Sequence, residues 1–190
     1  MRKLIFEEWL SLDGFAADGN NGLSFVGSMA LHKPSDQDQL DFLDGIDTIL
    51  LGAKTYPLFV DFWPTATNDQ QIIADRLNSI PKLIFSKSMS KAPWGKWPDA
   101  GLVKTDAVEA LKKLKSQEGK DMVLWGSISL AQSFMRENLI DEYHLRICPV
   151  VIGVGRPLFA KTGIIHLKLF ESKTYPSGLV MLKYRTALPV

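Results

Sequence analysis

The chain has 190 residues, of which 46% are hydrophobic and 23% are charged, and its formal net charge is +1 at pH 7. This composition is typical of a globular protein with enough residues for a sizeable core, and it excludes an intrinsically disordered chain. The nearly balanced charge argues against a protein that binds mainly nucleic acid or an anionic membrane surface.

The cysteine count and the length of the apolar runs indicate the cellular compartment of the protein. The single cysteine, Cys148, allows no disulfide within the chain, as is usual in a reducing compartment. No apolar run approaches the roughly 20 residues of a membrane-spanning helix. The first residues read as a strand rather than a signal peptide, because acidic residues interrupt the apolar stretch. We therefore expect a cytoplasmic protein that folds as one domain over residues 1–190 and contains no repeats.

Hydrophobic periodicity and turn residues divide the first half of the chain into alternating strands and helices. In chain order, the predicted elements are a strand at 3–11, a loop at 13–34, a helix at 36–45, a strand at 48–51, helical stretches at 55–62 and 72–77, and strands at 82–85 and 101–104. Ser35 is a plausible N-cap of the first helix.

The second half continues this alternation and ends in a hairpin. In chain order, we predict a helix that Asp106 caps, a strand at 122–125, a helix directly after it, and strands at 143–151, 167–174 and 180–186. The last two strands flank a Pro-Ser-Gly turn, which is typical of a β-hairpin. Strands that alternate with helices indicate an α/β fold with three α/β/α layers, in which the central sheet is mostly parallel and the C-terminal hairpin antiparallel.

The loops after three predicted strands carry small or hydroxyl residues, and two of them carry a lysine. These loops are Gly52–Thr55, Ser86–Ser88 and Gly126–Ser129. In open parallel sheets, ligands bind at the carboxyl ends of the strands. A helix that begins directly after Gly126 offers unpaired N–H groups to an anion, and a glycine there allows close approach. The pattern therefore indicates a phosphate-binding edge, although lysines and serines that merely solvate loop tips would give the same pattern.

Five segments make the sequence similar to the dihydrofolate reductase-like superfamily. They are SLDGFAA at 11–17, LLGAKTY at 50–56, LIFSKS at 83–88, WGSISLAQSFMRENLIDEYHL at 125–145 and PVVIGVGRPLF at 149–159. The chain most resembles the reductase domain of bifunctional riboflavin-biosynthesis deaminase-reductases and their stand-alone relatives. The resemblance implies a mostly parallel sheet with flanking helices. With one cysteine, the zinc motif of the deaminase is not found, so we expect the reductase part alone.

The resemblance implies that NADPH is the hydride donor and assigns residues to it. Around the phosphates it places Gly52, Lys54, Thr55, Ser86, Lys87, Gly126, Ser127, Ile128 and Ser129, and beside the nicotinamide it places Leu12, Asp13, Gly14 and Ala16. Trp125 ends a strand at the same edge. Lys54 and Lys87 would flank the 2′-phosphate of the adenosine ribose. Many relatives have two glycines where this chain has Gly126–Ser127, so we expect the Ser127 hydroxyl to bind a phosphate oxygen while its Cβ limits the approach of the backbone.

The sequence offers several candidates for the proton donor and for the residues that contact the substrate. Asp13, which follows the first strand, and Asp36 and Asp38, near the start of the first helix, are the candidate catalytic carboxylates. Alternatively, Asp13 only forms a turn, and the other two belong to a solvated helix face. Arg146 is expected either to bind a substrate phosphate or carboxylate, or to pair with Glu142 or Glu8. Trp9 can stack on a planar ring. The scattered histidines predict no metal site.

The sequence therefore predicts an NADPH-dependent reductase of a small planar heterocycle, of the pterin or ribosylated pyrimidine type. The alternative is an NADP(H)- or nucleotide-binding protein of the same fold without turnover. The apolar segment Ile147–Phe159 also indicates a homodimer, because relatives commonly pair through this region and a long apolar edge tends to associate. A monomer with this segment buried in its own sheet is the alternative.

Overall fold

The computed structural model describes residues 1–27 and 33–187. The chain divides into two compact units. Unit 1 comprises Met1–Leu4 and Ser35–Ser127, and unit 2 comprises Ile5–Pro34 and Ile128–Val190. No helix in the described parts of the chain is both long enough and apolar enough to span a bilayer.

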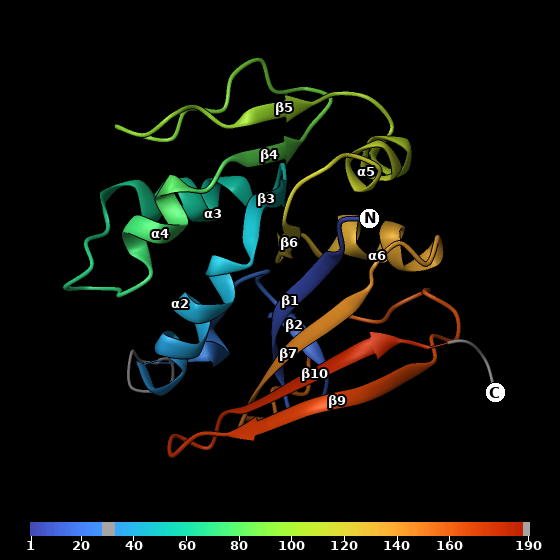
Figure 1. Ribbon diagram of the computed structural model, residues 1–190. Helices are drawn as coiled ribbons and strands as arrows, with labels where there is room; N and C mark the ends of the chain where they lie inside the picture. Colours follow the sequence, from blue (N-terminus) through green and yellow to red (C-terminus); the bar gives the residue numbers. More distant parts are fainter. Residues whose placement is uncertain (28–32, 188–190) are drawn as a thin grey trace. The chain divides into compact units, whose positions relative to one another are not determined.

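Unit 1 is built on four parallel strands. They are β3 (Ile46–Gly52), β4 (Lys82–Phe85), β5 (Gly101–Val103) and β6 (Asp121–Trp125). Their order is β5-β4-β3-β6, and β5, β4 and β3 lie side by side in Figure 1. β3 and β6 are nearly continuous apolar runs that are buried along most of their length, as expected for strands of a parallel sheet covered on both faces.

One α-helix of unit 1 precedes β3, and three more lie between the strands that follow. They are α2 (Asp36–Asp44), α3 (Tyr56–Val60), α4 (Ala74–Ser79) and α5 (Ala107–Lys115), with a 3-10 turn η3 (Trp63–Thr65) between α3 and α4. Asp106 caps α5 as predicted, because its carboxylate accepts hydrogen bonds from the N–H groups of Val108 and Glu109. Ser35 occupies the N-cap position of α2, but its side chain makes no capping hydrogen bond.

Unit 2 combines a parallel strand pair with an antiparallel hairpin. β1 (Leu4–Ser11), whose first residue belongs to unit 1, pairs in parallel with β7 (Glu142–Cys148), and β7 pairs with β10 (Val180–Thr186) in the antiparallel sense. β10 closes the hairpin with β9 (Leu167–Thr174), which is visible in red and orange in Figure 1. α6 (Ile128–Arg136) buries Ile128, Ala131, Phe134 and Met135.

These pairings confirm the predicted α/β class, with mostly parallel strands and an antiparallel C-terminal hairpin. Two predictions were wrong. The expected loop at 13–34 contains a short strand, β2 (Phe15–Asp18), which pairs with β8 (Gly155–Pro157), and a 3-10 turn, η1 (Ser24–Val26). The strand expected at 143–151 ends at Cys148, because Pro149 has no N–H group for the ladder.

Candidate functional site

The three predicted phosphate loops, the third as far as Ser127, lie next to one another in unit 1, at the carboxyl ends of β4, β3 and β6. Hydrogen bonds join them directly. The N–H of Ala53 donates to the carbonyl of Phe85 at 3.2 Å, and the N–H of Gly52 donates to Ser127 Oγ at 2.7 Å. The N–H of Ser127 in turn donates to Thr55 Oγ1 at 2.9 Å. Adjacent parallel strands thus bring segments 75 residues apart into one constellation.

The turn after β6 has an unusual backbone. Gly126 and Ser127 both adopt positive φ angles, of 54° and 58°. A Cβ at Gly126 would lie 3.0 Å from Thr55 Cγ2, so glycine allows the two turns to approach each other closely. The preceding residue, Trp125, is buried and stacks on Phe59 of α3, with ring centroids 5.9 Å apart. This stacking ties the end of β6 to α3.

The polar residues of these loops fall into exposed and buried groups. Lys54 and Lys87 are exposed at the same edge, where their ammonium groups are available to an anion. Ser86 is buried, and its hydroxyl oxygen accepts a hydrogen bond from the N–H of Met89 at 3.2 Å. The edge therefore presents two exposed cations on loops that hydrogen bonds join to one another.

The remaining residues assigned to the cofactor belong to unit 2. Leu12 is 66% exposed and donates its N–H to the carbonyl of Val150, Gly14 adopts a φ of 83°, and Ala16 is buried in β2. Ile128 is buried at the start of α6. Ser129, one residue further on, accepts a hydrogen bond from the Arg156 guanidinium at 2.7 Å. This contact could not be deduced from local pattern, because Arg156 lies in β8, 27 residues further along the chain.

The Asp13 carboxylate is hydrogen-bonded to a neighbouring loop of unit 2. It accepts hydrogen bonds from the N–H groups of Gly153 at 2.8 Å and Ile152 at 3.3 Å. A hydrogen bond from Ser11, and then these backbone bonds, lower the pKa of Asp13. A carboxylate that stays ionised supplies no proton near neutral pH, so this geometry favours an anchoring role for Asp13.

The other candidate carboxylates lie in a helix turn. Asp36 and Asp38 occupy the first turn of α2, where the helix dipole favours negative charge. Both are partly buried.

Arg146 is buried in β7, and Glu7, which was not among the expected partners, forms an ion pair with it. Its Nε lies 3.4 Å from Glu7 Oε1, and its guanidinium carbon lies 5.2 Å from the centroid of the Trp9 ring. The neighbouring His144 pairs with Glu142 at 3.3 Å. The expected pairing of Arg146 with Glu8 is wrong, because the parallel register sets Trp9 opposite Arg146, so that Glu7 rather than Glu8 projects from the same face as Arg146.

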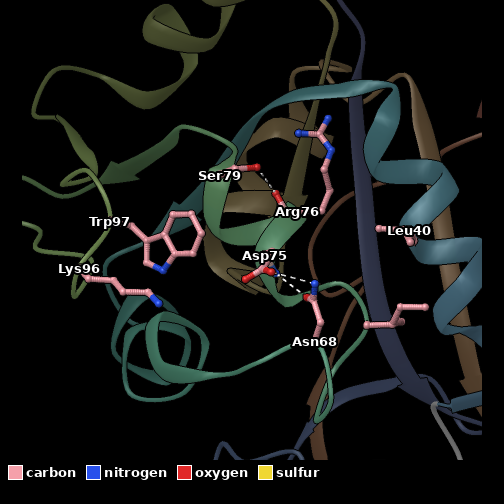
Figure 2. A pocket seen from close by; sticks show the side chains of 8 residues that line it. Leu40, Asn68, Asp75, Arg76, Ser79, Lys96 and Trp97 are labelled. Atoms are coloured by element: carbon pink, nitrogen blue, oxygen red, sulfur yellow. Dashed lines mark hydrogen bonds between the residues drawn. The ribbon is translucent and has the colours of Figure 1, made fainter.

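An open groove of about 840 Å³ lies elsewhere in unit 1 (Figure 2). Its wall includes Trp97 and Lys96 from the loop before β5 and Asp75 from α4, which precedes β4. Asp75 is already occupied, because Asn68 Nδ2 donates to its carboxylate at 2.8 Å. None of the predicted cofactor residues lines this groove. We therefore place the candidate site at the three loops.

Across residues 1–27 and 33–187, no three His, Cys, Asp or Glu side chains gather closely enough to hold a metal ion.

Comparison with known proteins gives the family. The model of the RibD C-terminal domain matches residues 2–181. This chain belongs to the RibD C-terminal domain family. The uncharacterised protein YyaP of Bacillus subtilis (strain 168) is 33% identical over 186 residues, which cover 96% of this chain and 94% of YyaP. Membership of the family supports a reductase-type role.

Solved structures agree with the fold. A protein of Shewanella sp. PV-4 that is assigned to riboflavin biosynthesis has a TM-score of 0.78 at 23% identity, over 98% of this chain and 99% of that chain. A pyrimidine reductase-like protein of Corynebacterium diphtheriae has a TM-score of 0.66 at 18% identity, over 99% and 93% of the two chains. The resemblance inferred from the five sequence segments is therefore confirmed at the level of family and fold.

Proposed function

We propose that the protein is an NADPH-dependent reductase that transfers hydride to a small planar heterocycle of the pterin or ribosylated pyrimidine type. The single observation that carries this proposal is the constellation of unit 1. Three loops at the carboxyl ends of β4, β3 and β6 are hydrogen-bonded together and expose Lys54 and Lys87 on the same edge. Membership of the RibD C-terminal domain family supports it.

The residues of the constellation fit the phosphate-bearing part of NADPH. Gly126 has no side chain to block an approaching pyrophosphate, and Thr55 carries a hydroxyl group beside it. Lys54 and Lys87 would bind the 2′-phosphate, which carries close to two negative charges near neutral pH and distinguishes NADPH from NADH. When bound, the nicotinamide supplies the hydride, while the protein orients the reactants and excludes water.

Cofactor preference tests this proposal. We expect NADPH to bind more tightly than NADH in a fluorescence titration, and the variant Lys54→Ala/Lys87→Ala to lose most of that preference. Each charge-assisted hydrogen bond contributes about 1.5–3 kcal/mol, so the loss for NADPH should exceed about tenfold. NADH affinity should change little, because NADH lacks the 2′-phosphate.

The matched control is Lys112→Ala/Lys113→Ala, which removes the same charge from the exposed side of α5. Its cofactor preference should equal that of the unmodified protein. Equal affinity of the unmodified protein for NADPH and NADH would refute the assignment of the two lysines.

A second candidate function is NADP(H) binding without turnover. The observation that favours it is that the Asp13 carboxylate accepts hydrogen bonds from two backbone N–H groups and has a lowered pKa, which argues against Asp13 as the proton donor. In that case NADPH would bind and persist unoxidised with every pterin and ribosylated pyrimidine tried.

We further propose that the protein forms a two-fold symmetric homodimer through unit 2. Within the segment Ile147–Phe159, Val151 is 65% exposed, Val154 74% and Phe159 42%. Apolar side chains exposed together in one segment indicate a surface that associates. In a symmetric dimer, the same patch would meet itself.

A further inference from the structure

Ser127 joins the turns after β3 and β6 with both its backbone and its side chain. Its Oγ accepts a hydrogen bond from the N–H of Gly52 at 2.7 Å and donates one to the carbonyl of Trp125 at 2.9 Å. Its own N–H donates to Thr55 Oγ1. Since a hydroxyl has a single hydrogen, the Ser127 hydroxyl has none left for a phosphate oxygen. The expected direct contact between this hydroxyl and a phosphate therefore has no donor.

Thr55, in contrast, retains an unused donor. Its oxygen accepts from the N–H of Ser127, and within the described chain no acceptor receives its hydroxyl hydrogen. Thr55 stands at the N-cap position of α3 but makes no side-chain capping bond there. The N–H of Ser127 occupies one side of the Thr55 oxygen, so the Thr55 hydrogen is directed away from Ser127.

The backbone of Ser127 is in a conformation that only glycine adopts freely. A φ of 58° costs a non-glycine residue on the order of 1 kcal/mol. The serine is also 9% exposed, so its hydroxyl is removed from water. The three hydrogen bonds of Ser127 offset this strain, and they hold the two turns at a fixed separation.

We propose that Ser127 is a positioning residue for the cofactor: it locks the turn after β6 to the turn after β3 and aims the Thr55 hydroxyl at a phosphate group. Ser127 acts through Thr55 and does not itself touch the phosphate. This inference rests on the proposed function, because it requires that a phosphate of NADPH lies at these loops.

Four variants test the inference by NADPH titration and steady-state kinetics. Thr55→Val removes the donor and should weaken NADPH binding about tenfold, whereas Thr55→Ser keeps the hydroxyl and should restore most of it. Ser127→Ala frees Gly52 and Trp125 from their shared partner and should raise the KM for NADPH about three- to tenfold, with kcat at saturating NADPH unchanged. Ser127→Gly should behave similarly, because it relieves the strained φ but also loses the hydroxyl.

The double variant Ser127→Ala/Thr55→Val distinguishes positioning from direct contact. If Ser127 acts through Thr55, the double variant should bind NADPH no more weakly than Thr55→Val alone. The control for simple destabilisation is Asn78→Ala, because Asn78 is buried and hydrogen-bonded to Trp63 and Trp94. It should lower the melting temperature and leave the KM for NADPH unchanged.

Two results would overturn the inference alone. In one, the unmodified protein and Ser127→Ala bind NADPH equally well, although Ser127→Ala is less stable. In the other, the effects of Ser127→Ala and Thr55→Val add fully in the double variant. Failure of the unmodified protein to bind NADPH would instead overturn the proposed function, and this inference with it.

Discussion

Glu8 is a carboxylic acid buried inside β1. It is 4% exposed, its Oε1 accepts a hydrogen bond from the N–H of Trp9, and its Oε2 has no hydrogen-bond partner among the described residues. Burial raises the pKa of Glu8 to about 8. The neighbouring Glu7 has Arg146 as its ion-pair partner. Glu7 and Glu8 are thus accommodated in the interior in different ways. Glu7 forms an ion pair with Arg146, whereas Glu8 keeps its proton.

The raised pKa of Glu8 should make stability depend on pH. Below about 4.5 the carboxyl is protonated in the folded and unfolded chains alike. Between about 4.5 and 8 only the folded chain keeps the proton, so unfolding releases it and stability falls as pH rises. The slope contributed by Glu8 is at most about 1.4 kcal/mol per pH unit. We expect Glu8→Gln to flatten chemical unfolding free energies measured across this range.

The measurement should stay below about pH 7, because the buried Lys82 has a pKa lowered by burial to about 7 and its titration raises stability above that value. Glu118→Gln, at an exposed site, is the matched control and should keep the slope of the unmodified protein. An unchanged slope in Glu8→Gln would show that Glu8 is ionised in the folded protein.

At the scale of elements, caps and turns decide where helices begin. Asp106→Ala should lower the free energy of unfolding by about 0.5–2 kcal/mol, because it leaves the N–H groups of Val108 and Glu109 without their acceptor. Asp106→Asn keeps a side-chain oxygen and should retain most of the stability. Urea unfolding checks both variants, and equal losses in the two would argue that charge rather than capping matters here.

Much of this element structure could be predicted from the sequence. β4, β9 and β10 have the predicted bounds, because clear apolar or alternating runs end at turn residues. β2 was missed because it has only four residues, and its partner β8 lies far along the chain. A short strand of this kind depends on its partner rather than on its own pattern.

The location of the candidate site could be predicted from the sequence, but its individual hydrogen bonds and ion pairs could not. The position of loops after parallel strands follows from the fold, so the sequence was sufficient to bring Gly52, Lys87 and Gly126 to one edge. The bond between Ser127 and Thr55 links residues 72 positions apart, and the ion pair of Arg146 with Glu7 depends on strand register. Neither can be deduced from local pattern.

At the scale of the whole molecule, we expect a homodimer. Light scattering at micromolar protein should give the mass of two chains, and Val151→Lys/Val154→Lys should give the mass of one, because two charges would be placed in the proposed interface. Ile164→Lys, at an apolar position that is 89% exposed but lies outside the segment Ile147–Phe159, is the control and should remain dimeric. A monomer mass at every concentration would refute the dimer.

The central claim is hydride transfer from NADPH, and isotope transfer tests it most directly. The protein would be incubated with NADPH deuterated at the transferable position of the nicotinamide, together with a panel of pterins and ribosylated pyrimidines. We predict that at least one substrate is reduced and that mass spectrometry finds the deuterium on its carbon. If NADPH binds at saturation but no member of the panel oxidises it, the reductase account is contradicted and the protein is a cofactor-binding protein without turnover.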